Sequence, residues 1–186
     1  RAEMAVVASG NKIYVIGGYN SEGCSDVLEV YDIIDNEWSQ GESMSVARRG
    51  AAAVVFDGNI YVIGGKNNSG EYLSTVEKYN IDSGQWETIS AQLKYPRAYL
   101  GAEVINGKIY ALGGFNGKSH LSVVEVFDPE KPEKGWVDSH NILRPIYDGG
   151  KHKKIPEPRS SFGTAVVYNQ IYLIGGEDEN GLMERS

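Results

Sequence analysis

The sequence predicts an all-β protein in which four-stranded antiparallel sheets repeat along the chain as the blades of a β-propeller. Glycine doublets recur at regular intervals, an arginine and two aromatic residues keep pace with them, and turn residues separate short runs of strand-forming residues. The composition agrees, because 23 glycines and 12 tyrosines among 186 residues favour turns and pleated sheets over helices.

The repeat is defined by an apolar run that ends in Gly-Gly. It occurs at Ile13–Gly18, Ile60–Gly65, Ile109–Gly114 and Ile171–Gly176. The first glycines are 47, 49 and 62 residues apart, and the opening arginines Arg1, Arg48, Arg97 and Arg159 share these intervals. An aromatic residue and then a tryptophan follow the first three doublets, at Tyr31 and Trp38, Tyr79 and Trp86, and Phe127 and Trp136. The chain therefore holds about three and a half copies of one unit.

Each unit divides into four strands, and the second unit shows them in order. The predicted strands are Ala51–Phe56, Ile60–Ile63, Thr75–Tyr79 and Trp86–Ile89. Asp57-Gly58 suits a tight hairpin whose central residues need positive φ. A polar loop, Lys66–Ser74, follows the glycine doublet, and a turn over Asn80–Gln85 joins the last two strands.

The strand before each doublet is continuously apolar, so we expect both of its faces to be covered. A single four-stranded sheet cannot cover itself, whereas sheets stacked around an axis can. The doublet then marks a sharp turn where a neighbouring backbone or ring comes close, and the periodic Tyr and Trp fill the space between sheets. The most regularly repeated residues are therefore predicted to be structural.

The opening arginines, the Ile-Tyr-x-(Ile/Leu)-Gly-Gly strands and the spaced aromatic residues together resemble the Kelch motif over nearly the whole chain. The resemblance implies a ring of six or seven blades with the first strand of each innermost. Ala51–Phe56, Leu100–Ile105 and Gly163–Tyr168 would line the central channel. The expected blades are residues 1–46, 47–95 and 96–157, with half a blade at 158–186, so we expect a longer chain to complete the ring.

The third unit departs from the pattern. Between Trp136 and Gly175 lie 39 residues, where the equivalent gaps are 26 and 27. The excess falls in Ser139–Glu157, which contains the basic run 151–154. We interpret it as a lengthened connection to the fourth blade, either functional or disordered.

Loop residues that differ between repeats are the candidates for binding. In Kelch domains that bind proteins, contacts commonly come from the residue after Gly-Gly and from residues just after the opening Arg. The resemblance thus implies a partner-binding set of Tyr19, Lys66, Phe115, Glu177, Arg49, Tyr99 and Ser161. Large aromatic and forked cationic side chains are suitable anchors for a protein or peptide.

No catalytic residue, metal site or cofactor is predicted. The three histidines show no ligand spacing, and the glycine pairs end strands instead of opening helices, so they do not cradle phosphate. Two Kelch-fold enzymes remain alternatives, a copper-radical oxidase and a sialic-acid mutarotase. The mutarotase would need charged side chains on the inner strands, where Glu103 is one of the few.

The net charge of −7 argues against nucleic-acid and membrane partners, and the single Cys24 favours the cytoplasm, or the nucleus. The resulting prediction is a non-catalytic protein-interaction module. Met44–Arg49 resembles the stretch that joins blades in BTB–Kelch adaptors, which implies substrate recognition for a cullin ubiquitin ligase through a domain elsewhere in the parent chain. An actin-associated or other scaffolding Kelch protein is the alternative.

Overall fold

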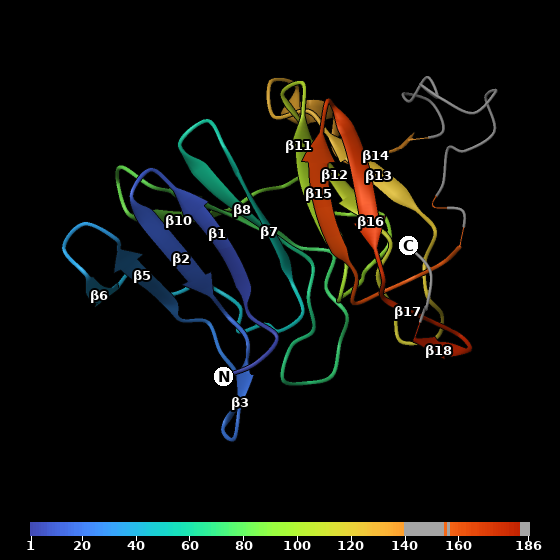
Figure 1. Ribbon diagram of the computed structural model, residues 1–186, viewed down its shortest axis with the longest axis horizontal. Coiled ribbons are helices and arrows are strands. Elements are labelled where there is room, and N and C mark those ends of the chain that lie inside the picture. Colours follow the sequence, from blue (N-terminus) through green and yellow to red (C-terminus); the bar gives the residue numbers. More distant parts are fainter. Residues whose placement is uncertain (140–154, 156, 183–186) are drawn as a thin grey trace.

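The structure is a computed structural model that describes residues 1–139, 155 and 157–182. Its strands form separate sheets that fan out side by side (Figure 1). Almost all of the expected insertion, 139–157, and the whole basic run 151–154 lie outside the described residues.

Three complete four-stranded antiparallel sheets follow one another along the chain, and we number them blades 1 to 3. Blade 1 contains β1 (Ala5–Ser9), β2 (Lys12–Ile16), β5 (Leu28–Asp32) and β6 (Glu37–Gln40). Blade 2 contains β7 (Ala52–Phe56), β8 (Asn59–Ile63), β9 (Val76–Asn80) and β10 (Gln85–Thr88). Blade 3 contains β11 (Gly101–Ile105), β12 (Lys108–Leu112), β13 (Val124–Phe127) and β14 (Val137–Asp138).

The remaining elements are short. The described part of blade 4 is the hairpin of β15 (Gly163–Val167) and β16 (Gln170–Ile174). Two-residue ribbons follow the first and last glycine doublets, as β3 (Tyr19–Asn20) with β4 (Gly23–Cys24) and β17 (Glu177–Asp178) with β18 (Gly181–Leu182). A 3-10 turn, η1 (Pro132–Lys134), lies between β13 and β14. The predicted all-β fold is therefore confirmed. None of the described segments forms a helix long and apolar enough to cross a membrane.

The first strands of the four blades lie next to one another. Strand β1 contacts β7, β7 contacts β11, and β11 contacts β15, so the blades meet along these strands and their later strands lie farther out (Figure 1). In blade 2 the observed strands lie within one residue of those predicted from sequence. Asp57 and Gly58 have φ of 47° and 68°, as the expected hairpin turn requires.

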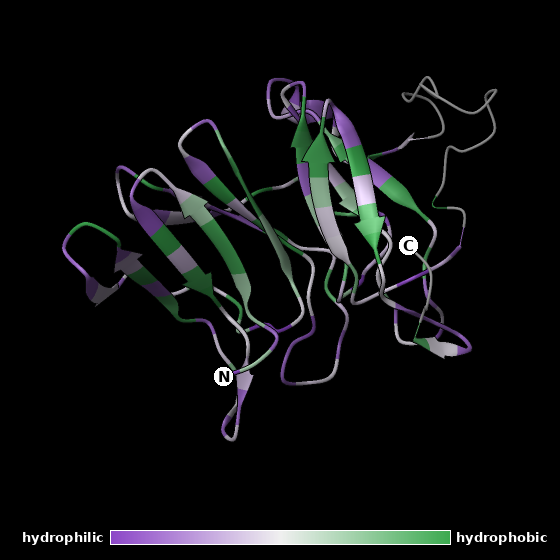
Figure 2. Ribbon diagram, viewed as in Figure 1, coloured by the Kyte–Doolittle hydropathy of each residue, from purple (hydrophilic) through white to green (hydrophobic). Residues whose placement is uncertain are grey.

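The core lies between the blades, where apolar positions of the strands face one another (Figure 2). Residues 60–63 of β8 and 109–112 of β12 are buried throughout, which confirms that the middle strands are covered on both faces. Strand β16 differs, because Tyr172 and Ile174 are exposed where no further blade is described.

The periodic tryptophans also differ in exposure: Trp136 is 2% exposed, but Trp38 is 60% exposed. The expectation that the tryptophans fill inter-blade spaces is met by Trp136 and stays a prediction for Trp38, because no described blade packs on that side of blade 1.

In blades 1 to 3 an ion pair ties the opening arginine to the third strand of the same blade. The Arg48 guanidinium lies 2.6 Å from the Glu77 carboxylate, and Arg97 lies 2.5 Å from Glu125, with all four side chains at most 1% exposed. Arg1 pairs with Glu29 at 2.7 Å in the same way, although Glu29 is more open to solvent. We call these arginines and glutamates the buried frame. The glutamates recur at the register of the arginines, a marker that the sequence analysis missed.

The backbone carbonyls of the same arginines explain why the doublets are glycines. Gly64 has φ +66°, and a Cβ added there would lie 2.5 Å from the carbonyl oxygen of Arg97 in the next blade. The following amide, of Gly65, donates a hydrogen bond to that oxygen at 2.8 Å. A side chain at Gly64 would therefore separate blades 2 and 3, which confirms the predicted close approach of a neighbouring backbone.

Candidate functional site

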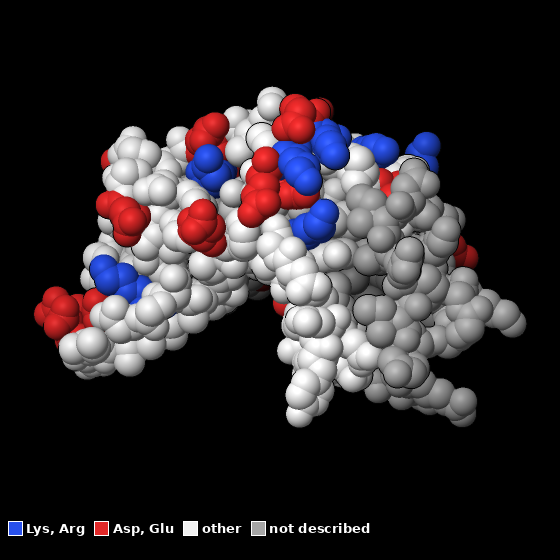
Figure 3. Space-filling view, turned by 90° about the horizontal axis from the view of Figure 1, so that it is seen from above, with Lys and Arg blue, Asp and Glu red and all other residues white. Residues whose placement is uncertain are grey.

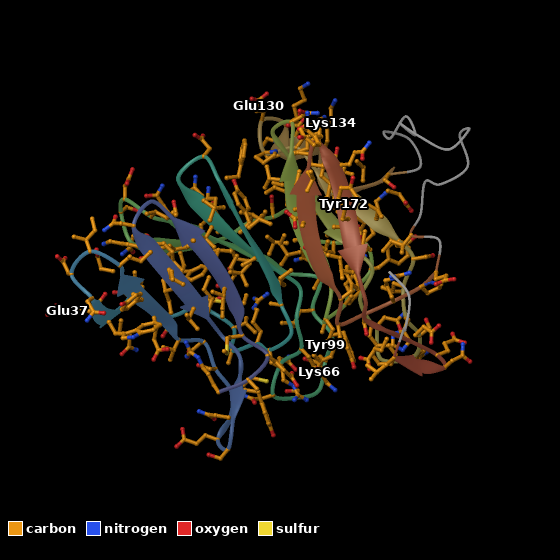
Figure 4. The ribbon with its side chains drawn as sticks, in the orientation of Figure 1. Glu37, Lys66, Tyr99, Glu130, Lys134 and Tyr172 are labelled. Carbon is orange, nitrogen blue, oxygen red and sulfur yellow. The ribbon has the colours of Figure 1, made fainter. Side chains whose placement is uncertain are left out.

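The two loop sets predicted to carry the site lie together at one end of the blades, which we call the loop end. Figure 4 shows Lys66 and Tyr99 there, with Glu130 and Lys134 at the opposite end. That opposite end, viewed in Figure 3, carries acidic and basic side chains interspersed. The site is therefore built from the loop end alone.

A pair of extended residues is repeated in all four blades at the loop end. The residue after each Gly-Gly pairs with the residue after an opening arginine, and we call these the rim pairs: Ala2 with Tyr19, Arg49 with Lys66, Ala98 with Phe115, and Ser160 with Glu177. Each pair exchanges two backbone hydrogen bonds of 2.8 to 3.0 Å. The backbone is thus the same in every blade, so the rim pairs differ only in their side chains.

The chemistry of the rim pairs changes from blade to blade. It is aromatic at Tyr19 in blade 1, doubly basic in blade 2, aromatic again at Phe115 in blade 3, and hydroxyl and acidic in blade 4. The residue immediately before each pair is an arginine or a glycine in every blade. Variation is therefore confined to the side chains that reach the loop end.

The rim residues form a continuous row across the four blades, in which Arg49 and Lys66 are linked through their backbones and the other neighbours through their side chains. The Arg49 guanidinium lies 4.4 Å above the ring of Tyr19, and the Lys66 ammonium lies 5.0 Å from the ring of Tyr72. The members of this contact row, in spatial order, are Tyr19, Arg49, Lys66, Tyr72, Phe115, His120, Ser160 and Glu177. The ring centroids of Tyr72 and Phe115 lie 5.8 Å apart, and those of Phe115 and His120 lie 5.1 Å apart. The Ser160 hydroxyl hydrogen-bonds the His120 ring at 3.1 Å and the Glu177 carboxylate at 3.2 Å.

A second feature of the loop end is a chain of backbone hydrogen bonds that runs from blade to blade. The residue two positions after each opening arginine, namely Glu3, Gly50, Tyr99 or Ser161, has a φ of 55° to 60°. Their amides form a chain, with Gly50 donating to the carbonyl of Glu3, Tyr99 to that of Gly50, and Ser161 to that of Tyr99, at 2.9, 2.6 and 2.9 Å. We call these four residues the collar. It links each blade to the next through backbone hydrogen bonds.

Tyr99 crosses the collar from blade 3 to blade 1. Its ring lies where a Cβ on Gly50 would be, 2.7 Å from that position, and its hydroxyl hydrogen-bonds the Glu3 carboxylate at 3.1 Å. Burial, and then the negative charge of Glu3, raise the pKa of Tyr99 to about 12. Tyr99 is therefore a neutral hydrogen-bond donor at physiological pH.

All seven sequence-predicted residues lie at the loop end, in two roles. Five belong to the contact row, namely Tyr19, Arg49, Lys66, Phe115 and Glu177, and two, Tyr99 and Ser161, belong to the collar. Ser161 also donates a hydrogen bond from its hydroxyl to Glu177 at 2.9 Å. Whether these residues contact a partner stays a prediction. The sequence analysis missed Glu3, Tyr72, His120 and Ser160, although the equivalent register in each repeat would have identified Glu3 and Ser160.

The inner strands offer little chemistry. Along β1, β7, β11 and β15 the only charged residue is Glu103. Within the described parts of the chain, no three His, Cys, Asp or Glu side chains are placed to hold a metal ion. The Cys24 thiol lies under the loop end, 3.4 Å from the carbonyl of Lys66, where burial raises its pKa.

Comparison with known proteins adds a family and a fold. Residues 3–184 match the family described as "KLHDC2/KLHL20/DRC7 Kelch-repeats domain". Kelch-like protein 25 of Xenopus tropicalis is 30% identical over 96% of this chain. The Kelch repeat and BTB domain-containing protein 1 of cowpox virus is 27% identical over 95% of it. The chain spans 29% of the length of each of these two relatives.

A solved structure described as "Structure of YjhT" superposes with a TM-score of 0.73 and 19% identity. The match covers 94% of this chain and 58% of that one. It shows a shared fold.

Proposed function

The chain belongs to the Kelch-repeat family, and from that premise we propose that its loop end binds a partner protein or peptide without catalysing a reaction. The observation that carries this proposal is the set of rim pairs. Four identical backbone pairs present aromatic, basic, aromatic and acidic side chains in one contact row. A rigid frame with side chains that vary at one register is what a specific binding surface requires.

Two further features support binding over catalysis. Aromatic and arginine side chains, which are enriched among the residues that contribute most to protein interfaces, make up half of the contact row as Tyr19, Arg49, Tyr72 and Phe115. The inner strands, where a Kelch-fold sugar enzyme would need charged groups, contribute only Glu103.

Within this class we propose that the parent protein is a substrate-recognition adaptor of a cullin ubiquitin ligase. The proposal is supported by the resemblance of Met44–Arg49 to the blade connection of BTB–Kelch proteins and by the relative whose name includes a BTB domain. Met44 is buried and Arg48 belongs to the buried frame, so this stretch also has a structural role in the blade.

The test uses the full-length protein with paired variants. Tyr19→Ala and Phe115→Ala change the contact row, and Tyr168→Ala is the control, because Tyr168 is 96% exposed in the β15–β16 turn at the opposite end. Proteins captured by the wild type should be lost from the double variant and retained by Tyr168→Ala. The affinity of a purified captured protein should fall by about tenfold or more in the double variant, as expected for aromatic anchors.

The adaptor role is read out separately. A cullin should co-purify with the wild type and equally with the double variant, because its binding would involve another part of the parent chain. Loss of the partner with retention of the cullin supports both proposals. Partner binding that is the same in all variants contradicts a role for the loop end, and absence of any cullin from wild-type complexes contradicts the adaptor role.

A further inference from the structure

We infer that the rim pair of blade 2 is an anion anchor that takes the carboxylate of an aspartate or glutamate from an acidic segment of the partner protein. The inference rests on the proposed function and specifies the chemistry of its partner. It depends on Arg49 and Lys66, which stand directly opposite each other in a mutually hydrogen-bonded pair.

The pair places two like charges on adjacent positions. In a pair that exchanges both backbone hydrogen bonds, the Cα atoms are about 5.5 Å apart and the side chains leave on the same face. Like charges directly opposite each other destabilise a ladder. The other three rim pairs carry no such repulsion, since they are Ala2 with Tyr19, Ala98 with Phe115, and Ser160 with Glu177.

Among the described residues, carboxylates neutralise the pair only in part. In the described parts of the chain no ion pair of 4.0 Å or less joins a carboxylate to the Lys66 ammonium, and the buried Nε of Arg49 has no hydrogen-bond partner. The nearest carboxylate to Arg49 is that of Glu3, at 3.5 Å, and Glu3 also accepts the hydroxyl of Tyr99. Arg49 therefore shares the Glu3 carboxylate with the Tyr99 hydroxyl, and Lys66 has no carboxylate partner among the described residues.

Each of the two cations packs on an aromatic ring. Arg49 stacks on Tyr19 and Lys66 on Tyr72, which keeps both cationic side chains packed against the loop end while their charge remains available. On the far side of Tyr72 the ring of Phe115 makes an edge contact at 5.8 Å. A carboxylate between the cations would thus have an aromatic surface beside it for a neighbouring apolar side chain.

The rest of the molecule makes this site selective. The chain carries a net charge of −7, so an acidic segment is favoured at this basic pair over the acidic parts of the surface. At the other end of the contact row Glu177 and the following Asp178 and Glu179 disfavour a second acidic group. The surface therefore favours a segment whose acidic residue is confined to one end.

The experiment selects random 12-residue peptides displayed on phage against the full-length protein. Peptides that bind should be enriched in Asp or Glu, and one is then synthesised together with its Asn or Gln counterpart. Lys66→Glu should weaken binding of the acidic peptide by about tenfold or more, and a peptide with Lys in place of the acidic residue should regain affinity for this variant. Arg49→Gln should weaken it in the same direction.

Lys134→Glu is the matched control, because Lys134 is exposed and lies at the opposite end of the blades (Figure 4). It should leave the affinity unchanged, and thermal unfolding should show that Lys66→Glu remains folded. If Lys66→Glu unfolds, Lys66→Gln takes its place. Peptides without acidic enrichment that still depend on Tyr19 and Phe115 would overturn the anion anchor and leave the proposed function standing. Peptides that bind independently of every contact-row residue would overturn both.

Discussion

Adjacent residues of this repeat belong to two regions with opposite character. Arg48 and Arg97 are buried and paired with glutamates of the buried frame, while the residue that follows each of them joins a rim pair at the loop end. One step along an extended chain reverses the direction of the side chain, so one position faces the core and the next faces out. The buried frame, whose residues recur from blade to blade, holds the blades together. The rim pairs, whose residues differ from blade to blade, form the candidate binding surface.

The buried frame itself differs between the middle and the edges of the fan. Arg97 has its glutamate and also contacts the preceding blade through Gly65, whereas Arg1 has its glutamate but no described blade precedes it. Identical repeat positions should therefore differ greatly in their contribution to stability, and paired substitutions can measure that difference.

The largest expected effect is that of Arg97→Ala. It leaves the Glu125 carboxylate buried without its cation, which costs about 3–5 kcal/mol of unfolding free energy. Arg1→Ala removes a pair whose glutamate is 47% exposed, and should cost under about 1 kcal/mol. Guanidinium unfolding of the full-length protein measures both. Equal costs would show that the frame contributes no more in the middle than at the edge.

The next contrast compares two tryptophans at the same repeat position. Trp136 stacks on Phe127 at 5.4 Å and is 2% exposed, so Trp136→Ala should cost about 3–5 kcal/mol. Trp38 is 60% exposed, and Trp38→Ala should cost under about 1 kcal/mol. The thermal midpoint should fall clearly only for the first variant. A comparable fall for Trp38→Ala would mean that the exposed face of blade 1 is covered in the full-length protein.

A smaller effect is expected from the glycine doublets. Alanine at either Gly64 or Gly175 must adopt a positive φ, which costs roughly 1–2 kcal/mol. At Gly64 the new Cβ would also meet the Arg97 carbonyl at 2.5 Å, whereas nothing lies within 4 Å at Gly175. Gly64→Ala should therefore destabilise the protein more than Gly175→Ala in the same unfolding assay. An equal effect would show that backbone strain alone, and not inter-blade contact, fixes the doublet.

The repeating structural residues could be predicted from the sequence more completely than the residues of the contact row. Arg48, Gly64 and Tyr79 recur at fixed spacing because every blade meets its neighbour in the same way, so periodicity alone identified them. The members of the rim pairs also occupy fixed positions, which is why Tyr19, Lys66 and Phe115 could be named in advance. Tyr72 and His120 could not, because they reach the contact row from within loops whose residues follow no repeat. The exposure of Trp38 depends on what packs beside blade 1, which no local pattern records.

The smallest expected effect concerns Tyr99, which joins the two regions because it belongs to the collar and reaches Glu3. Its pKa is raised to about 12, from an ordinary value of 10.0, by burial first and by the Glu3 charge second. A raised pKa in the folded protein means that the folded state holds its proton more tightly. The resulting stabilisation is complete below the unfolded pKa of 10.0 and is lost as the pH rises towards 12.

Ultraviolet titration of the phenolates tests this account of Tyr99. The difference between the wild type and Tyr99→Phe isolates one ionisation, which should lie about two units above that of an exposed tyrosine, and Glu3→Gln should move it downwards by removing the negative charge. Glu3 is the one carboxylate that the described residues place within 4.0 Å of Arg49, so the same Glu3→Gln variant should strengthen binding of an acidic peptide at the rim. A Tyr99 ionisation at the ordinary pKa would place its hydroxyl in solvent, and the collar would then be a backbone feature with no side-chain link between blades 1 and 3.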